Sequence, residues 1–207
     1  MPRPRRATAE FEARRSARRA DPAHETQQRA HLAQVAARLI AEHGIADWSL
    51  AKRKAAQELG LRDRAALPAD DEIETALADY HALYGGSRHA ATLHGQREEA
   101  LAWMRRLEGY SPRLTGGVAA GWATAHSDIR IELIAPDAKV VELTLINAGV
   151  NYRTAHEGAA NAPAELYIDT PRGGVRLVVR SPEAARQRPR AAEERLDRAG
   201  VEAILRG

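Results

Sequence analysis

The chain has 207 residues, enough for one well-buried core with a helical extension, and its 31 Lys and Arg against 28 Asp and Glu give a formal net charge of +3. It contains no cysteine, which excludes disulfides, thiolate catalysis and thiolate zinc sites. No apolar run approaches the roughly 18 residues of a membrane span, and the arginine-rich start lacks a secretion signal, so we expect a cytoplasmic protein with no membrane partner.

Positive charge gathers near the N-terminus. Residues 1–64 hold 14 Lys and Arg against 8 Asp and Glu, whereas the remaining residues hold 17 against 20. Residues 1–24 contain seven arginines and only one large apolar side chain, Phe11, so we expect a disordered arm or a solvated helix there. Such a basic segment could contact RNA, and the abundance of arginine beside alanine also fits compositional bias.

Residues 25–95 are expected to be helical. Apolar residues recur at helical spacing over 25–43, and a second helix should start at Asp47 or Ser49 and end near Gly60. A third helix covers about 70–84, and a fourth follows after a loop of small residues and histidines. The first two helices resemble the start of a helix-turn-helix repressor, but the acidic start of the third would repel DNA phosphates. We therefore do not expect a DNA-reading domain.

The stretch 113–135 carries the candidate chemistry. Gly116 and Gly117 lack a Cβ, so the backbone can turn sharply there and present its amides to phosphate oxygens. Further on, apolar residues alternate with polar ones, and this period of two places the polar set on one face of a strand. That set is Asp128, Arg130 and Glu132. A phosphate-binding turn beside a carboxylate suits metal-assisted phosphoryl chemistry.

This stretch resembles the signature of the nucleotidyltransferase superfamily with the DNA polymerase beta-type palm: Gly-Ser, a small spacer, Arg-Gly, then Ser-Asp-x-Asp on a strand. Gly116 and Gly121 match the two glycines, and Ser127-Asp128 match Ser-Asp in register. Gly117 stands where serine is usual. The resemblance implies a palm that binds a nucleoside triphosphate with Mg or Mn. It assigns the nucleotide to Gly116, Gly117, Gly121, Ser127 and Arg130.

Two positions depart from that signature. Ala120 replaces the usual arginine, and Arg130 occupies the second acidic position, where it supplies no oxygen for a metal. The chain is similar in this to bacterial nucleotidyltransferase-like proteins, in which that position is often not acidic. Glu132, on the same strand face, is the candidate substitute, and Arg130 would then neutralise phosphate charge. The resemblance thus assigns catalysis to Asp128, Glu132 and Asp169, and the metal to Asp128 and Glu132.

Asp169 is the candidate third carboxylate, although Asp before a Thr-Pro turn is also an ordinary turn residue. Trp122 could stack on a nucleobase, but a large aromatic after a glycine turn more often packs that turn onto the core. His126, at the lip of the expected site, either touches a phosphate or ends a loop.

After the motif we expect one helix over 138–148, strands at 150–153, 165–169 and 175–180, and a helix over 189–205. The predicted fold is α+β, with a small mixed sheet of nucleotidyltransferase-palm type that carries helices on one face, and with a helical N-terminal extension. The predicted parts are a basic arm (1–24), a helical N-terminal region (25–95) and a nucleotidyltransferase-like domain with a C-terminal helix (96–207).

Two functions are expected from this pattern. The first is transfer of a nucleoside monophosphate from a bound nucleoside triphosphate to an RNA or protein acceptor. The alternative is a catalytically inactive palm that binds nucleotide or RNA through Arg130, Arg113 and the basic N-terminal region. A protein that inherited the fold and binds another protein is a third interpretation.

Overall fold

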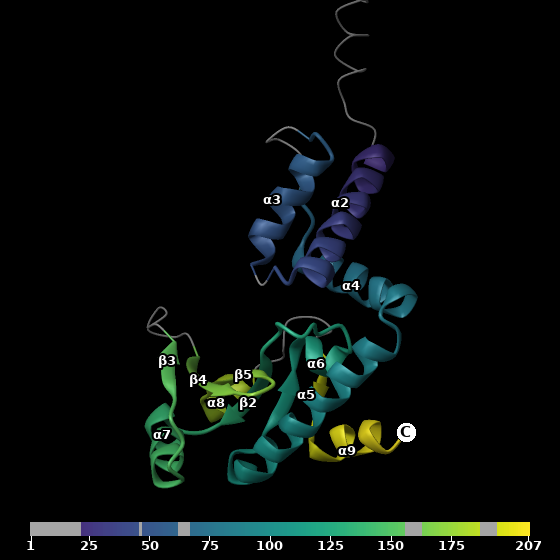
Figure 1. The fold of residues 1–207 in the computed structure, drawn as a ribbon. Coiled ribbons are helices and arrows are strands. Elements are labelled where there is room, and N and C mark those ends of the chain that lie inside the picture. Colours follow the sequence, from purple (N-terminus) through teal and green to yellow (C-terminus); the bar gives the residue numbers. More distant parts are fainter. Residues whose placement is uncertain (1–21, 46, 62–66, 156–162, 187–193) are drawn as a thin grey trace, which may run out of the picture.

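The computed structural model is α+β and describes residues 22–45, 47–61, 67–155, 163–186 and 194–207. Most of the predicted basic arm, residues 1–21, lies outside these residues. A helical region precedes a region built on a sheet (Figure 1). None of the described helices is both long enough and apolar enough to cross a membrane.

The helical region consists of three helices around a small core. They are α2 (Pro22–His43), α3 (Trp48–Glu58) and α4 (Asp70–Tyr84). Asp47 is the N-cap of α3, as one of the two predicted alternatives has it, because its carboxylate accepts the amides of Ser49 at 2.8 Å and Leu50 at 3.2 Å. Six alanines sit among the buried residues, so these helices pack closely. The buried set is Leu32, Ala33, Ala36, Ala37, Leu39, Ile40, Ala51, Ala55, Ile73, Ala76 and Leu77.

The junction between α4 and α5 (Gly86–Arg106) differs from the expectation. The predicted loop of small residues and histidines is wrong, because α5 begins as soon as α4 ends. Gly86, at φ +55°, supplies the change of direction, and the residues after it readily form helix. His81 of α4 and His89 of α5 stack across the junction, with ring centroids 3.8 Å apart and planes 5° from parallel.

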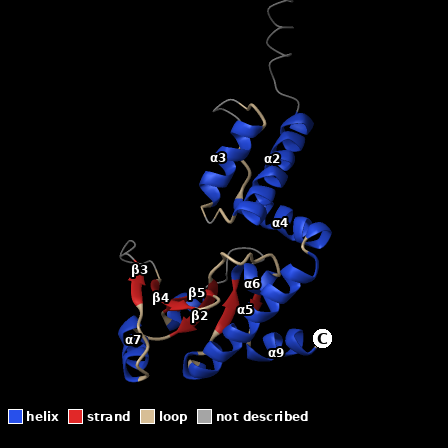
Figure 2. Ribbon diagram, in the orientation of Figure 1, coloured by secondary structure: helices blue, strands red, loops and turns tan. Residues whose placement is uncertain are grey.

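The second region contains a mixed sheet of six strands, as predicted in class (Figure 2). Its order is β3-β4-β5-β2-β1-β6; β2 and β5 run parallel, and every other neighbouring pair is antiparallel. The strands are β1 (Arg113–Thr115), β2 (Ile129–Ile134), β3 (Arg153–Ala155), β4 (Ala164–Thr170), β5 (Gly173–Arg180) and β6 (Arg195–Leu196).

One face of this sheet is the main core. Ile129, Ile131 and Leu133 of β2 are fully buried there, which confirms the predicted alternation. The short 3-10 helix η1 (Glu108–Tyr110) leads from α5 into β1, and four further helices complete the region. These are α6 (Gly116–Ala120), α7 (Ala138–Asn147), α8 (Pro182–Arg186) and α9 (Arg198–Arg206). Helices α5 and α9 contact each other and β1, so they cover the core face.

Two sequence expectations fail near the C-terminus and at the sheet edge. The predicted helix over 189–205 is wrong in its first part, because Arg195–Leu196 pairs with β1 and Asp197 caps α9. Residues 187–193 lie outside the described residues. The strand expected at 150–153 begins only at Arg153. In both places a short strand forms because a neighbouring strand offers unpaired backbone groups, a contact that local sequence does not reveal.

The buried residues form two separate clusters, one within 32–77 and one within 93–201. The predicted boundary between 95 and 96 falls inside α5, whose buried side chains belong to the sheet region. Trp122 is the exception in the other direction, because it comes from the sheet region and packs against the helical core.

We expect the His81–His89 stack to make stability depend on pH. Burial lowers the pKa of His81 from 6.5 to about 4, and neighbouring His89 lowers it further. Below pH 6.5 the unfolded chain binds a proton that the folded chain refuses until about pH 4, so the free energy of unfolding should fall over this range.

Urea denaturation at several pH values would measure this fall. His81→Phe should flatten the profile, whereas His31→Gln, which changes an exposed histidine of α2, should leave it unchanged. An equally steep profile in His81→Phe would contradict the assignment.

Candidate functional site

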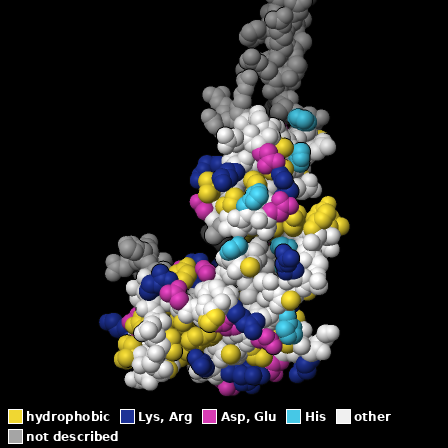
Figure 3. Space-filling model, in the orientation of Figure 1, with side chains coloured by type: hydrophobic (Ala, Val, Ile, Leu, Met, Phe, Trp, Pro, Cys, Tyr) yellow, Lys and Arg dark blue, Asp and Glu magenta, His cyan; other side chains and the backbone are white. Residues whose placement is uncertain are grey.

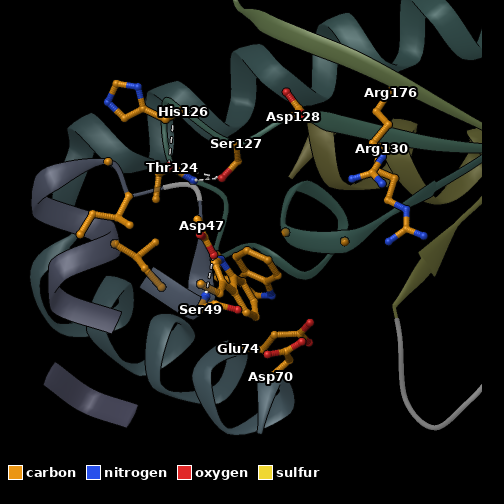
Figure 4. A pocket seen from close by; sticks show the side chains of 17 residues that line it. Asp47, Ser49, Asp70, Glu74, Thr124, His126, Ser127, Asp128, Arg130 and Arg176 are labelled. Atoms are coloured by element: carbon orange, nitrogen blue, oxygen red, sulfur yellow. Dashed lines mark hydrogen bonds between the residues drawn. The ribbon is translucent and has the colours of Figure 1, made fainter. Parts of the chain in front are cut away.

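A cavity of about 530 Å³ opens between the helical region and the sheet region (Figure 4). The helical side contributes residues of α2, of the start of α3 and of α4. The sheet side contributes five of the predicted site residues, namely Gly116, Gly117, Ser127, Asp128 and Arg130, together with Trp122, Thr124, His126 and Arg176. The predicted motif therefore lines a cavity, and the helical region supplies its other wall.

The glycines of the motif form a short helix rather than an open turn. Gly116 begins α6 at φ +69°, and Gly121 ends it at φ +90°, both conformations that favour glycine. A Cβ on Gly117 would lie 2.7 Å from the ring of Trp122. The Trp122 ring therefore occupies the space where the nucleotidyltransferase signature has a serine side chain. Gly121 is not among the residues that line the cavity.

Three side chains of α5 hold the backbone of the motif in place. Each of them hydrogen-bonds carbonyl oxygens between β1 and β2. His89 Nε2 lies 3.1 Å from Gly121 O; Gln96 Nε2 donates to Thr124 O at 2.9 Å and to Ser127 O at 3.3 Å; Arg97 donates to Val118 O at 3.0 Å and to Ala119 O at 3.2 Å. The position of the motif is thus fixed by one helix.

Ser127 closes the loop that precedes β2. Its Oγ accepts the amide of Thr124 at 3.0 Å and lies 3.3 Å from the Thr124 hydroxyl. Ser127 lines the cavity, but this oxygen is already engaged within the loop. Its visible role is to orient the residue that follows it, Asp128.

Asp128 stands at the start of β2, between two cavities. One is the cavity described above, and the other, of about 510 Å³, is lined by Asp128, Arg153, Thr154, Tyr167, Asp169, Gly173 and Gly174. Although Asp128 is exposed overall, one side of its carboxylate packs on Gly174, where a Cβ would lie 2.8 Å from Oδ1. This partial loss of water raises the pKa of Asp128, against the opposing effect of Arg176.

The three predicted carboxylates are not all together. Glu132 is only 5% exposed and lies 3.1 Å from Arg180 and 3.3 Å from Arg195, away from both cavities. Asp169 shares the second cavity with Asp128 and forms an ion pair with Arg153 at 2.6 Å. No group of three or more potential metal ligands occurs within the described ranges.

Arg130 and Arg176 form the cationic wall of the first cavity (Figure 4). They are paired in register on the parallel strands β2 and β5. Glu165 holds Nη2 of Arg176 at 2.6 Å, and the Arg176 guanidinium lies 5.5 Å from the ring of Tyr167. Sequence reasoning missed Arg176. Its alternation with Val175 and Leu177 was visible, but its place beside Arg130 depends on which strands pair.

Aromatic contacts join the two regions at this cavity. Trp48 and Trp122 lie 5.3 Å apart, tilted by 54°, and the packing interpretation of Trp122 is therefore confirmed. The indole Nε1 of Trp122 is buried and has no hydrogen-bond partner within the described part of the chain. His126 packs on Gly44, where a Cβ would lie 2.4 Å from the imidazole ring.

Comparison of this chain with protein-family models, with curated proteins and with solved structures gives no match in any of the three. What the cavity can do is therefore inferred from its own residues.

We expect Gly117→Ala to disturb the cavity wall, because the new Cβ would collide with Trp122. The free energy of unfolding should fall by about 1–3 kcal/mol, the usual cost of overpacking, and tryptophan fluorescence should shift. Gly109→Ala is the matched control, because a Cβ there meets nothing within 4 Å. Urea denaturation followed by fluorescence measures both variants, and equal effects would refute this role of Gly117.

Proposed function

We propose that this protein binds a nucleoside triphosphate, together with a divalent metal ion, in the cavity between its helical and sheet regions. The observation that carries the proposal is the register pair Arg130 and Arg176, which faces the cavity beside Gly116 and Asp128. Guanidinium groups match phosphate oxygens in charge and geometry, and two of them on adjacent strands suit a chain of phosphates.

The residues of the second cavity fit magnesium or manganese. Magnesium in proteins is commonly held by one or two carboxylates, by substrate phosphates and by water. Asp128 and Asp169 lie on strands separated by β5, so their Cα atoms are about 10 Å apart. Only the bare backbone of Gly174 lies between them in register. The metal is thus assigned to Asp128 and Asp169 rather than to Glu132, which two arginines already neutralise.

The tryptophan pair supports a nucleoside rather than a bare phosphate chain. Trp48 and Trp122 line the same cavity as the two arginines and offer aromatic surface to a base. A buried N–H without a partner is costly, and a base or ribose oxygen would satisfy Nε1 of Trp122.

The order of elements also supports a palm of nucleotidyltransferase type. Strand β1, the glycine segment α6 and strand β2 with Asp128 at its start follow one another as the resemblance implies. Binding is the function that the cavity supports best, because the carboxylates of a two-metal site are not gathered in one place.

Transfer is the second candidate, and the cavity on the far side of Asp128 favours it. That cavity has room for an acceptor. An acceptor hydroxyl would lose its proton and attack the α-phosphorus, and the bond to the leaving pyrophosphate would break. Arg130 and Arg176 would neutralise the charge that develops on the phosphate oxygens.

Nucleotide binding should depend on the arginine pair. Each of Arg130→Gln and Arg176→Gln removes a charged contact to phosphate, so the Kd for a nucleoside triphosphate with magnesium should rise about tenfold or more. Isothermal titration calorimetry measures it, with Arg88→Gln on exposed α5 surface as the control. Unchanged Kd values in both cavity variants would refute the proposal.

Metal dependence should map to Asp128 and Asp169. Asp128→Asn and Asp169→Asn should each weaken Mn²⁺ binding, measured by electron paramagnetic resonance with a non-hydrolysable triphosphate present, whereas Glu132→Gln should not. Because the pKa of Asp128 is raised, Mn²⁺ binding should weaken as the pH falls and this carboxylate takes up a proton. Incubation with α-labelled triphosphates and cellular RNA or protein tests transfer; label that appears equally with Asp128→Asn would exclude it.

A further inference from the structure

The strand registers place six side chains in a single row across the polar face of the sheet. Consecutive members are register partners on neighbouring strands, from β3 at one edge to β6 at the other. The row runs Arg153, Tyr167, Arg176, Arg130, Thr115, Arg195, and we call it the arginine row. With neighbouring strands about 4.8 Å apart, it is about 24 Å long.

Carboxylates flank the arginine row and orient its guanidinium groups. Asp169 holds Nη2 of Arg153 at 2.6 Å, Glu165 holds Nη2 of Arg176 at 2.6 Å, and Glu132 lies 3.3 Å from Arg195. A guanidinium has five N–H donors, so these pairs use part of each group and leave the rest for a ligand. Basic and acidic side chains also lie side by side over the sheet region in Figure 3.

The charge of this face is positive. Its strands contribute six arginines, since Arg113 and Arg180 join the four of the row, against the four carboxylates Asp128, Glu132, Glu165 and Asp169. An excess of two positive charges on one sheet face attracts an anion.

Polar atoms on this face are buried without hydrogen-bond partners. Thr115 is fully buried, and its Oγ1 has no partner within the described residues; the Nε atoms of Arg176 and Arg180 are likewise buried and unpartnered there. Buried polar groups in proteins are nearly always hydrogen-bonded. Several such atoms on one cationic face therefore point to an acceptor-rich ligand.

We propose that the arginine row binds a single-stranded nucleic acid, whose phosphates run across the strands of the sheet. Arginines recur along the row as phosphates recur along a polynucleotide. Tyr167 lies within the row, with Arg176 over its ring, and offers a surface on which an unpaired base stacks. A duplex has no unpaired base to place there.

The proposal goes beyond nucleotide binding and shares only its centre. Arg130 and Arg176 belong both to the arginine row and to the nucleotide cavity, whereas Arg195 lines neither cavity. A change at Arg195 therefore separates the two ligands.

The test is fluorescence anisotropy of the full chain with a labelled oligouridylate of about twelve nucleotides, over a series of salt concentrations. The double variant Glu132→Gln with Arg195→Gln removes the arginine and its buried carboxylate together. We expect the Kd for the oligonucleotide to rise about three- to tenfold, and the slope of log K against log salt to become shallower by about 0.7, the value for one phosphate contact. The Kd for nucleoside triphosphate should stay within about twofold.

Arg105→Gln with Glu202→Gln is the matched control, because it removes an ion pair between α5 and α9 and makes the same change in net charge. Thermal unfolding confirms that both variants are folded. Oligonucleotide binding unchanged in the row variant, or weakened equally in the control, would overturn the proposal. So would equally tight, Arg195-dependent binding of a duplex or of inorganic polyphosphate.

Failure of the two proposals is distinguishable. Oligonucleotide binding that depends on Arg195, without any binding of nucleoside triphosphate, would support the arginine row and sink the proposed function. Triphosphate binding that depends on Arg130, with oligonucleotide binding indifferent to Arg195, would do the opposite.

Discussion

The grip of α5 on the backbone between β1 and β2 is the constraint on which the candidate site depends. His89, Gln96 and Arg97 together bind five carbonyl oxygens of that segment. The segment contains little regular structure of its own, so without these donors its carbonyls would be left unsatisfied. Because α5 also packs in the main core, the groups that face the cavity are held by the most deeply buried part of the sheet region.

The cavity exists because two cores meet there without merging. Trp122 reaches from the sheet region into the helical core, His126 covers Gly44, and His81 stacks on His89 at the junction. His89 belongs both to this junction and to the grip on the motif, through Gly121. Any rotation of the helical region about Gly86 would therefore be felt at the glycine that ends α6.

Much of the fold followed from local pattern. Alternation over 128–133 gave β2 its buried face, the Thr-Pro-Arg-Gly-Gly sequence gave the β4–β5 hairpin, and the glycine motif led to a real cavity. What local pattern could not give is partnership. Glu132 looked like a ligand until Arg180 and Arg195 were seen around it, and Arg176 looked like any exposed strand arginine until β5 was seen to lie beside β2.

The parallel pairing of β2 with β5 has a consequence for how the chain folds. Arg130 and Arg176 are 46 positions apart, and Thr115 and Arg195 are 80 apart, so the centre of the sheet depends on contacts that are distant in sequence. Such topologies fold slowly because the loops must close before the pairing compensates for their entropy. During synthesis, β2 must wait for β5 with its hydrogen-bonding edge unpaired, an aggregation hazard that a chaperone could relieve.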